Sequence, residues 1–245
     1  MDILVTGGTG RLGRHVVPAL RDRGHEVRVL SRRQGPGHVV GDLGTGAGIA
    51  PAVAGVDTVV HLASTSKNDD RQTRTLLDAL DGSRTHLVYI SIVGVDRVPL
   101  GLYRSKLAAE KAIAASGIPH TIIRVTQFHD FIVSMYLAPQ RHLPVTCVLP
   151  GTVQPIDLRD VAARMVELVE SGPSGRVADL AGPETRTLAE FAGEWQRSLG
   201  VRRPIWTLRL PIGFVRGVAA GGLTTGRPGD GRITFAEFLA AESAR

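Results

Sequence analysis

The fold of this chain is decided by residues 6–13, which read TGGTGRLG. The stretch follows a short apolar run typical of a strand and leads into residues 12–20, whose apolar side chains recur at helical spacing. In this G-x-x-G-x-x-G pattern Gly7 permits a tight turn, Gly10 lets the backbone approach a pyrophosphate, and Gly13 lets the helix pack closely on the sheet. The N–H groups at the start of the helix can then bind phosphate oxygens. The glycines alone would indicate a plain turn, but between a strand and a helix they predict a dinucleotide-binding loop.

Strands and helices alternate through the first half of the chain. Strands are predicted at residues 3–5, 26–30, 38–40, 57–62, 86–91 and 119–125, and helices at residues 12–20, 71–80 and 104–116. Such alternation implies parallel strands joined by right-handed crossovers. We therefore predict an α/β fold, with residues 1–125 forming a Rossmann doubly wound parallel sheet as the NAD(P)-binding core.

The second half of the chain is less regular. Here strands are predicted at residues 145–149 and 177–180, helices at residues 158–170, 187–199 and after residue 234, and a glycine-rich mobile loop or linker at residues 221–231. Thr187 and Glu190 form a capping-box pattern that Thr234 and Glu237 repeat. We interpret residues 126–245 as a mixed region that completes the sheet and forms a small C-terminal substrate-binding lobe, the whole chain being a single compact unit.

The end of the second predicted strand bears on the choice of cofactor. An NAD site often carries an acidic residue about twenty residues after the loop, where it binds the ribose hydroxyl. This chain has Arg32 and Arg33 there and no carboxylate. Two guanidinium groups suit a 2′-phosphate, so we predict that NADP(H) is preferred over NAD(H), the alternative being that both arginines lie in solvent. Asp42, after the third strand, either lies near the adenine or forms a turn.

The composition restricts the compartment and the partners. Cys147 is the one cysteine, so no disulfide can form within the chain and a reducing compartment is expected. There is no signal-peptide pattern and no apolar run long enough to span a bilayer, so we predict a cytoplasmic protein without a membrane partner. The net charge of +6 comes mostly from arginines spread along the chain, which argues against a nucleic-acid partner. No metal-binding motif is found, and the sequence leaves monomer and homodimer open.

These pieces together resemble an atypical short-chain dehydrogenase/reductase of the NmrA-like, NAD(P)H-binding family. The resemblance covers most of the chain. It is carried by residues 7–13, Asp42 and Leu43, HLAS at 61–64, YISIVG at 89–94, YRSK at 103–106, Arg124, QF at 127–128 and PIDLRD at 155–160. Members of this family bind NAD(P)H in the Rossmann half and a small substrate under the C-terminal lobe.

The resemblance implies cofactor-binding roles for many of these positions. Lys106 would bond the nicotinamide ribose, and Ile90 and Ser91 would end a strand near the nicotinamide. Ala63 and Ser64 would line the cofactor channel. The residues predicted or implied to bind the cofactor are Gly7, Thr9, Gly10, Arg11, Leu12, Gly13, Arg32, Arg33, Asp42, Leu43, Ala63, Ser64, Ile90, Ser91, Lys106, Gln127 and Phe128, the last two closing over the nicotinamide ring.

The proton-transfer residues of the wider family are displaced in this sequence. Working enzymes use a Tyr-x-x-x-Lys pair, in which the tyrosine is the acid or base and the lysine lowers its pKa. Here Leu102 takes the tyrosine position, and Tyr103 lies only three residues before Lys106, about 100° away around a helix. Ile92 takes the position of the family serine. We retain Lys106 and Tyr103 as the catalytic candidates.

Two functions are compatible with an intact cofactor motif and an altered proton-transfer motif. The first is a reductase that passes hydride from NADPH to a quinone-like or conjugated carbonyl small molecule, whose product anion needs little help from a protein acid. The second is a non-catalytic, NADP-sensing regulator of the NmrA type, which reports nucleotide state to a partner. His129 could donate a proton near neutral pH, although a structural role is the more common one for an isolated histidine.

Overall fold

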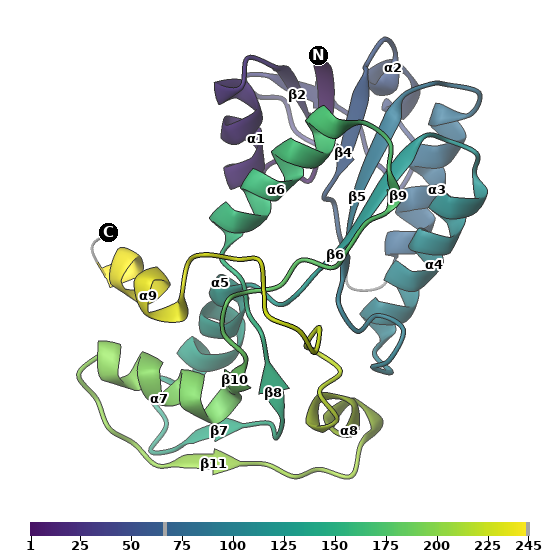
Figure 1. Ribbon diagram of the computed structural model, residues 1–245. Helices are drawn as coiled ribbons and strands as arrows, with labels where there is room; N and C mark the ends of the chain where they lie inside the picture. Colours follow the sequence, from purple (N-terminus) through teal and green to yellow (C-terminus); the bar gives the residue numbers. More distant parts are fainter. Residues whose placement is uncertain (66–67, 244–245) are drawn as a thin grey trace. The chain divides into compact units, whose positions relative to one another are not determined.

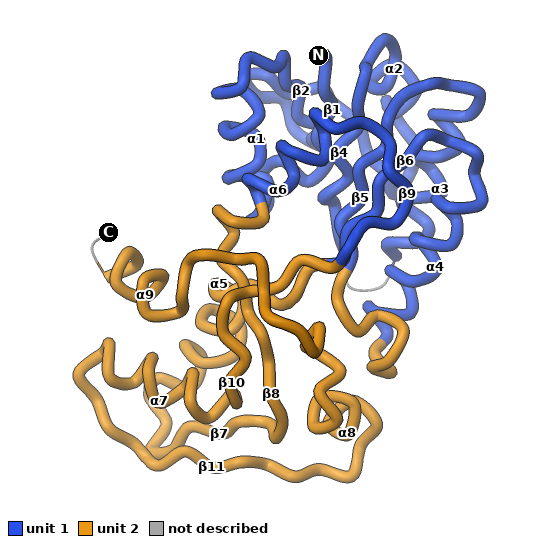
Figure 2. Tube along the Cα trace, viewed as in Figure 1, with its two compact units in different colours: residues 1–91, 101–124, 162–178 blue, residues 92–100, 125–161, 179–245 orange. Residues whose placement is uncertain are grey.

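A computed structural model describes residues 1–65 and 68–243. The chain divides into two compact units (Figure 2). Unit 1 comprises residues 1–91, 101–124 and 162–178, and unit 2 comprises residues 92–100, 125–161 and 179–245. Each unit is therefore assembled from segments that are separated in the sequence.

Unit 1 is built on a parallel sheet that has seven strands among the described residues (Figure 1). The strands are β1 (Asp2–Thr6), β2 (Glu26–Ser31), β3 (His38–Val40), β4 (Thr58–His61), β5 (His86–Ile92), β6 (His120–Val125) and β9 (Gly175–Arg176), in the spatial order β3-β2-β1-β4-β5-β6-β9. Strand β1 pairs with β2 on one side and with β4 on the other, so the strand order reverses there. Ligands of such sheets bind beyond the carboxyl ends of the strands at this reversal. The predicted Rossmann sheet is confirmed.

Helices pack on both faces of this sheet. They are α1 (Gly13–Asp22), α2 (Ile49–Val53), α3 (Asp69–Leu80), α4 (Gly101–Ala115) and α6 (Leu158–Ser171). A buried core joins α2, α3 and α4 to one face of the sheet and includes Leu4, Ile49, Val59, Leu76, Leu80, Leu87, Tyr89, Ala109 and Ile113. Helix α1 ends before Gly24, whose φ of 79° is the left-handed conformation expected after a helix.

Unit 2 consists of short elements. They are α5 (His129–Phe131), a π-helical segment (Ile132–Leu137), a 3₁₀ turn (Ala138–Gln140), β7 (Thr146–Val148), β8 (Thr152–Val153), β10 (Arg186–Thr187), α7 (Leu188–Ser198), β11 (Ile205–Thr207), α8 (Gly213–Ala219) and α9 (Phe235–Ser243). Strand β10 is antiparallel to β8, and β11 is parallel to β7. Both capping boxes form as the sequence predicts, Thr187 with Glu190 and Thr234 with Glu237.

The prediction of a strand at residues 177–180 is wrong. The chain pairs with β6 earlier, at Gly175 and Arg176, which lie opposite Thr121 and Ile122. Leu180 then makes only an isolated bridge to Val125. Three residues lie between Arg176 and Leu180, whereas two lie between their partners on β6, so an extra residue interrupts the ladder.

Residues 221–231 form a loop, as the sequence predicts, and it is anchored by side chains. The buried Gln154 donates from Nε2 to the carbonyl oxygen of Arg227 and accepts at Oε1 from Thr225 N. Asp160 accepts from the backbone N–H groups of Arg232 and Ile233 just beyond the loop. Within the described part of the chain, no helix is long and apolar enough to span a membrane.

Candidate dinucleotide-binding site

The glycine loop joins β1 to α1 with the close contacts that its spacing predicts. Gly7 has a φ of 68°, and a Cβ there would lie 2.6 Å from the backbone nitrogen of Ala63, on the loop after β4. A Cβ at Gly13 would collide with the carbonyl oxygen of Gly7 and the backbone of Gly8. Gly10 is exposed, and a Cβ there would meet only the carbonyl oxygen of Gly7, at 3.0 Å. Gly7 and Gly13 are thus required by backbone packing, whereas Gly10 leaves an open surface.

The N-terminus of α1 is suited to an anionic group. No side chain caps it, and its first turn holds no acidic residue. Thr9 and Arg11 are exposed beside Gly10, and the Nε of Arg14 donates to the carbonyl oxygen of Thr9. Leu12 is buried. The uncapped N–H groups and the positive end of the helix dipole match the phosphates of a dinucleotide.

Arg32 and Arg33 follow β2 at its carboxyl end. Both are exposed, and among residues 1–65 and 68–243 neither has an ionic partner. The N–H of Arg33 donates to Ser31 Oγ, which fixes the backbone of this turn. The two guanidinium groups therefore remain available to an anion.

The segment after β3 is organised by its own hydrogen bonds. Asp42 Oδ1 accepts from Gly44 N at 2.8 Å, which is the turn-forming arrangement. The Leu43 side chain is buried in the core shared with α2, α3 and α4. At these two positions one carboxylate oxygen of Asp42 and the side chain of Leu43 are used by the fold.

The loop after β4 connects the glycine loop to α3. Ala63 N donates to Thr6 Oγ1 at 3.2 Å, at the end of β1. Ser64 Oγ donates to Asp69 Oδ2 at 2.7 Å, in the first turn of α3. The two positions predicted to line the cofactor channel thus lie between β1 and the start of α3.

Lys106 lies on α4 with its ammonium group directed to the carboxyl end of β5. Its Nζ is 3.0 Å from Asp69 Oδ2, and it donates to Tyr89 Oη at 3.4 Å and to the carbonyl oxygen of Ile90 at 3.3 Å. The Lys106 side chain is 6% exposed. Burial lowers the pKa of Lys106, and the Asp69 carboxylate opposes that shift.

A neutral histidine completes this buried polar region. His61 Nδ1 lies 2.7 Å from Thr6 Oγ1, and its Nε2 lies 3.2 Å from Thr73 Oγ1. Burial, aided by the positive charge of Lys106, lowers the pKa of His61 to about 3, so its ring is neutral at physiological pH. The ring is 5.5 Å from that of Tyr89, between centroids.

The tyrosine hydroxyl that the structure places beside Lys106 is that of Tyr89, on β5. Tyr89 is fully buried, and burial raises the pKa of its hydroxyl well above the ordinary value, so the group stays protonated. Tyr103, the catalytic candidate from the sequence, is buried on α4, and Leu102 is half-buried beside it. Tyr89 and Asp69 were not assigned roles from the sequence, because their contact with Lys106 joins three separate elements.

Ser91 adds a polar group at the same end of β5. Its side chain is 2% exposed, and its Oγ has no hydrogen-bond partner within the described part of the chain. The neighbouring Ile90 contributes its carbonyl oxygen to Lys106. A buried hydroxyl without a partner is costly, so this group fits a site that a polar ligand completes.

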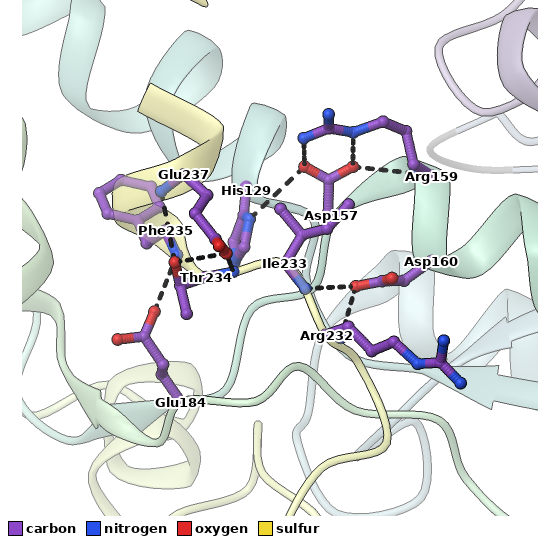
Figure 3. Close-up of polar contacts among 10 residues, drawn as sticks. All are labelled: His129, Asp157, Arg159, Asp160, Glu184, Arg232, Ile233, Thr234, Phe235 and Glu237. Carbon is purple, nitrogen blue, oxygen red and sulfur yellow. Dashed lines mark hydrogen bonds and ion pairs between the residues drawn. The ribbon is translucent and has the colours of Figure 1, made fainter. Parts of the chain in front are cut away.

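Gln127 and Phe128 belong to unit 2, where Gln127 O accepts from Ile156 N. The buried amide atoms of Gln127 have no hydrogen-bond partner among residues 1–65 and 68–243. The ring of the next residue, His129, packs against those of Phe235 and Phe238, with centroids 5.4 Å away in each case. Its Nδ1 is 3.9 Å from Asp157 Oδ2 (Figure 3).

His129 is buried in the core of unit 2. Desolvation lowers its pKa to about 4, against the attraction of Asp157. Asp157 in turn forms a bidentate pair with Arg159. His129 is therefore a neutral packing residue, as the structural alternative for this position predicts.

Comparison with known proteins gives relatives along most of the chain. A family model described as NAD(P)H-binding matches residues 7–171. A (4-alkanoyl-5-oxo-2,5-dihydrofuran-3-yl)methyl phosphate reductase of Streptomyces griseus is 35% identical, covering 83% of this chain and 75% of the relative. Quinone oxidoreductase 2 of Escherichia coli is 26% identical, covering 81% of this chain and 74% of the relative.

A crystal structure of an NADPH-dependent quinone oxidoreductase from Escherichia coli, complexed with NADPH, shares the fold. Its TM-score is 0.82 at 24% identity, and the match covers 98% of this chain and 99% of that one. The sheet and the glycine loop define a nucleotide-binding protein of the Rossmann class. More narrowly, the chain belongs to the NAD(P)H-binding family.

Proposed function

We propose that the chain is an NADPH-dependent reductase that acts on a quinone-like or conjugated carbonyl compound. The observation that carries the proposal is that the open phosphate surface at Gly10 and the ammonium of Lys106 lie in one unit, beyond strands β1 and β5 of one sheet. The phosphates would lie on the N-terminus of α1, and Lys106 would hold the nicotinamide ribose. Bound NADPH would supply a hydride.

The choice of acceptor follows from the acid–base groups. The hydroxyl next to Lys106 is that of Tyr89, which is buried and has a raised pKa, so it is a poor proton donor to a substrate. An acceptor whose reduced form is a stabilised anion can take its proton from water instead. A quinone that gains a hydride and a proton gives a hydroquinone, and the named substrates of both relatives described above agree with this chemistry.

The activity is tested by following NADPH absorbance with purified protein and a series of quinones and enones. We expect acceptor-dependent oxidation of NADPH that is strongly reduced in Lys106→Met. If NADPH binds but no acceptor in the series oxidises it, the reductase proposal is wrong and a nucleotide sensor is the better description.

We further propose that Arg32 and Arg33 select NADPH over NADH by binding the 2′-phosphate. Both are exposed and without an ionic partner in the described part of the chain. The double variant Arg32→Ala/Arg33→Ala should lose NADPH affinity by about tenfold or more while NADH affinity changes little, because each charge-assisted bond contributes about 1.5–3 kcal/mol.

The matched control is Arg84→Ala, an exposed arginine that precedes β5 at the amino end of the sheet. Fluorescence titration with both nucleotides measures the ratio of affinities. Equal loss of both affinities in the double variant, or equal loss in the control, would contradict the assignment.

A further inference from the structure

The ammonium group of Lys106 is held by contacts with the protein. Within the described part of the chain its partners are the Asp69 carboxylate, the Tyr89 hydroxyl and the Ile90 carbonyl oxygen. These partners come from α3 and β5, whereas Lys106 is on α4. The position of the charge at the end of β5 is therefore set by contacts between elements.

Of these three contacts, the one with Asp69 is the shortest, and Asp69 is the one partner that carries a charge. Its side chain is 1% exposed, and its Oδ2 lies 3.0 Å from Lys106 Nζ. Ser64 Oγ donates to Oδ2 at 2.7 Å, and Thr65 N donates to Oδ1 at 2.5 Å. The carboxylate also lies in the first turn of α3, where the helix dipole favours a negative charge. Asp69 is thus fixed independently of Lys106.

Other charged groups near Lys106 do not replace this carboxylate. Glu110, on α4, is held by Arg124 in a bidentate pair with a shortest distance of 2.7 Å. Asp70 accepts from Ser105 Oγ at 2.7 Å. His61, on β4, is neutral. A buried ammonium without a counter-charge is costly, so removal of the Asp69 charge should displace or neutralise Lys106.

We propose that Asp69 is a positioning residue, which holds the Lys106 ammonium at the carboxyl end of β5 and thereby sets the affinity for NADPH. The inference rests on the proposed function, in which Lys106 binds the nicotinamide ribose. Ser64, on the loop after β4, helps to hold the Asp69 carboxylate, because its hydroxyl donates to the same oxygen that contacts Lys106.

The neighbouring Asp70 offers a matched control. It lies in the same helical turn and carries the same charge, but it contacts Ser105 instead of Lys106. Asp70→Asn therefore reproduces the loss of one negative charge at the N-terminus of α3. If the charge of Asp69 only stabilised the end of the helix, Asp69→Asn and Asp70→Asn should affect NADPH binding equally.

The first test is a fluorescence titration with NADPH. Asp69→Asn should weaken binding by at least about tenfold, as loss of an outer partner to a ligand-binding group commonly does. Asp70→Asn should bind almost as the parent protein, and Asp69→Glu should recover part of the loss. The double variant Asp69→Asn/Lys106→Met should bind no worse than Lys106→Met alone, because the effect of Asp69 passes through Lys106.

The pH dependence of binding gives a readout that a structural defect would not produce. Without its carboxylate, the buried Lys106 loses its proton more readily, so NADPH affinity of Asp69→Asn should fall as the pH rises from about 6 to about 9. In the parent protein the Asp69 carboxylate favours the charged form of Lys106, so the fall in affinity should come at a higher pH than in Asp69→Asn. A flat profile in Asp69→Asn would overturn the inference.

The second test needs no nucleotide. The chain has only three lysines, Lys67, Lys106 and Lys111, so NMR of side-chain-labelled lysine gives three signals, and Lys106→Arg identifies the one from Lys106. The pKa of Lys106 should be lower in Asp69→Asn than in the parent by about one to three pH units, and much less changed in Asp70→Asn.

The two tests separate the inference from the function on which it rests. If the parent protein does not bind NADPH, the proposed function fails, while the NMR titration still shows whether Asp69 controls Lys106. If the parent binds NADPH and Asp69→Asn binds it equally well, the inference is overturned and the proposed function stands. Equal weakening by Asp69→Asn and Asp70→Asn would also overturn it.

Discussion

At the residue scale, the glycines of the loop should separate folding from ligand binding. A Cβ at Gly13 would collide with the backbone of Gly7 and Gly8, so Gly13→Ala should lower the free energy of unfolding by about 1–3 kcal/mol, the usual cost of overpacking. Gly10 is exposed and meets one carbonyl oxygen at 3.0 Å. Gly10→Ala should cost less stability than Gly13→Ala and still weaken NADPH binding, because the methyl group occupies the open surface.

Urea unfolding and NADPH titration of both variants measure the two effects. Gly24, with open space around it, is the reference for a glycine that matters only to its own turn. Normal NADPH affinity in Gly10→Ala would show that phosphates do not lie against this part of the loop.

The sequence predicts those site residues whose role is local. The glycine spacing and the arginines after β2 can be read directly, because each acts through its own segment. The partners of Lys106 cannot, since Asp69 and Tyr89 reach it from α3 and β5 through tertiary packing. The sequence predicts a catalytic tyrosine, Tyr103, on the same helix as Lys106. The hydroxyl that accepts from Lys106 belongs to Tyr89, on strand β5.

At the scale of the element, the capping box of α7 should stabilise unit 2. Thr187 Oγ1 accepts from Glu190 N, and Glu190 Oε2 accepts from Thr187 N at 2.8 Å. The helix buries Phe191 and Trp195, so its loss would expose a large apolar area. Thr187→Ala should lower the free energy of unfolding by about 0.5–2 kcal/mol, while Thr187→Ser should keep most of it.

Chemical denaturation of the two variants checks this prediction. The position belongs to unit 2, whereas the glycine loop belongs to unit 1, so NADPH affinity should not change. A Thr187→Ser variant as unstable as Thr187→Ala would show that the methyl group, and not the hydroxyl, matters.

Helix ends and long strands are predictable because their signals are local, and short strands are not. Both capping boxes begin helices where the sequence places them. The two- and three-residue strands β8, β10 and β11 leave no periodicity to read, and their existence depends on partners distant in the sequence. The misplaced strand at residues 177–180 has the same origin, because an extra residue opposite β6 shifts the pairing to Gly175 and Arg176.

At the scale of the whole molecule, the two units are discontinuous in the sequence. Residues 125–161 belong to unit 2, and residues 162–178 belong to unit 1 again. Helix α6 therefore begins in unit 2 and ends in unit 1. No local pattern marks such a return, since each piece of chain looks like an ordinary helix or strand. The sequence therefore predicts the sheet better than the way in which the remaining chain is divided.

Buried neutral histidines should make the molecule less stable as the solution is acidified. Burial lowers the pKa of His61 to about 3 and those of His86 and His129 to about 4. In the unfolded chain these groups titrate near 6.5, so below that pH the unfolded state binds more protons than the folded state. The free energy of unfolding should therefore fall from about pH 6.5 to about pH 4, each histidine contributing up to about 1.4 kcal/mol per pH unit.

Urea unfolding between about pH 7 and about pH 5 tests this above the range in which carboxylates titrate. His129→Phe keeps an aromatic ring against Phe235 and Phe238 and removes one of the three groups, so the slope should fall by about a third. A slope that is the same in His129→Phe as in the parent would mean that His129 is already protonated in the folded state, and its packing against two rings would then have to accommodate a charge.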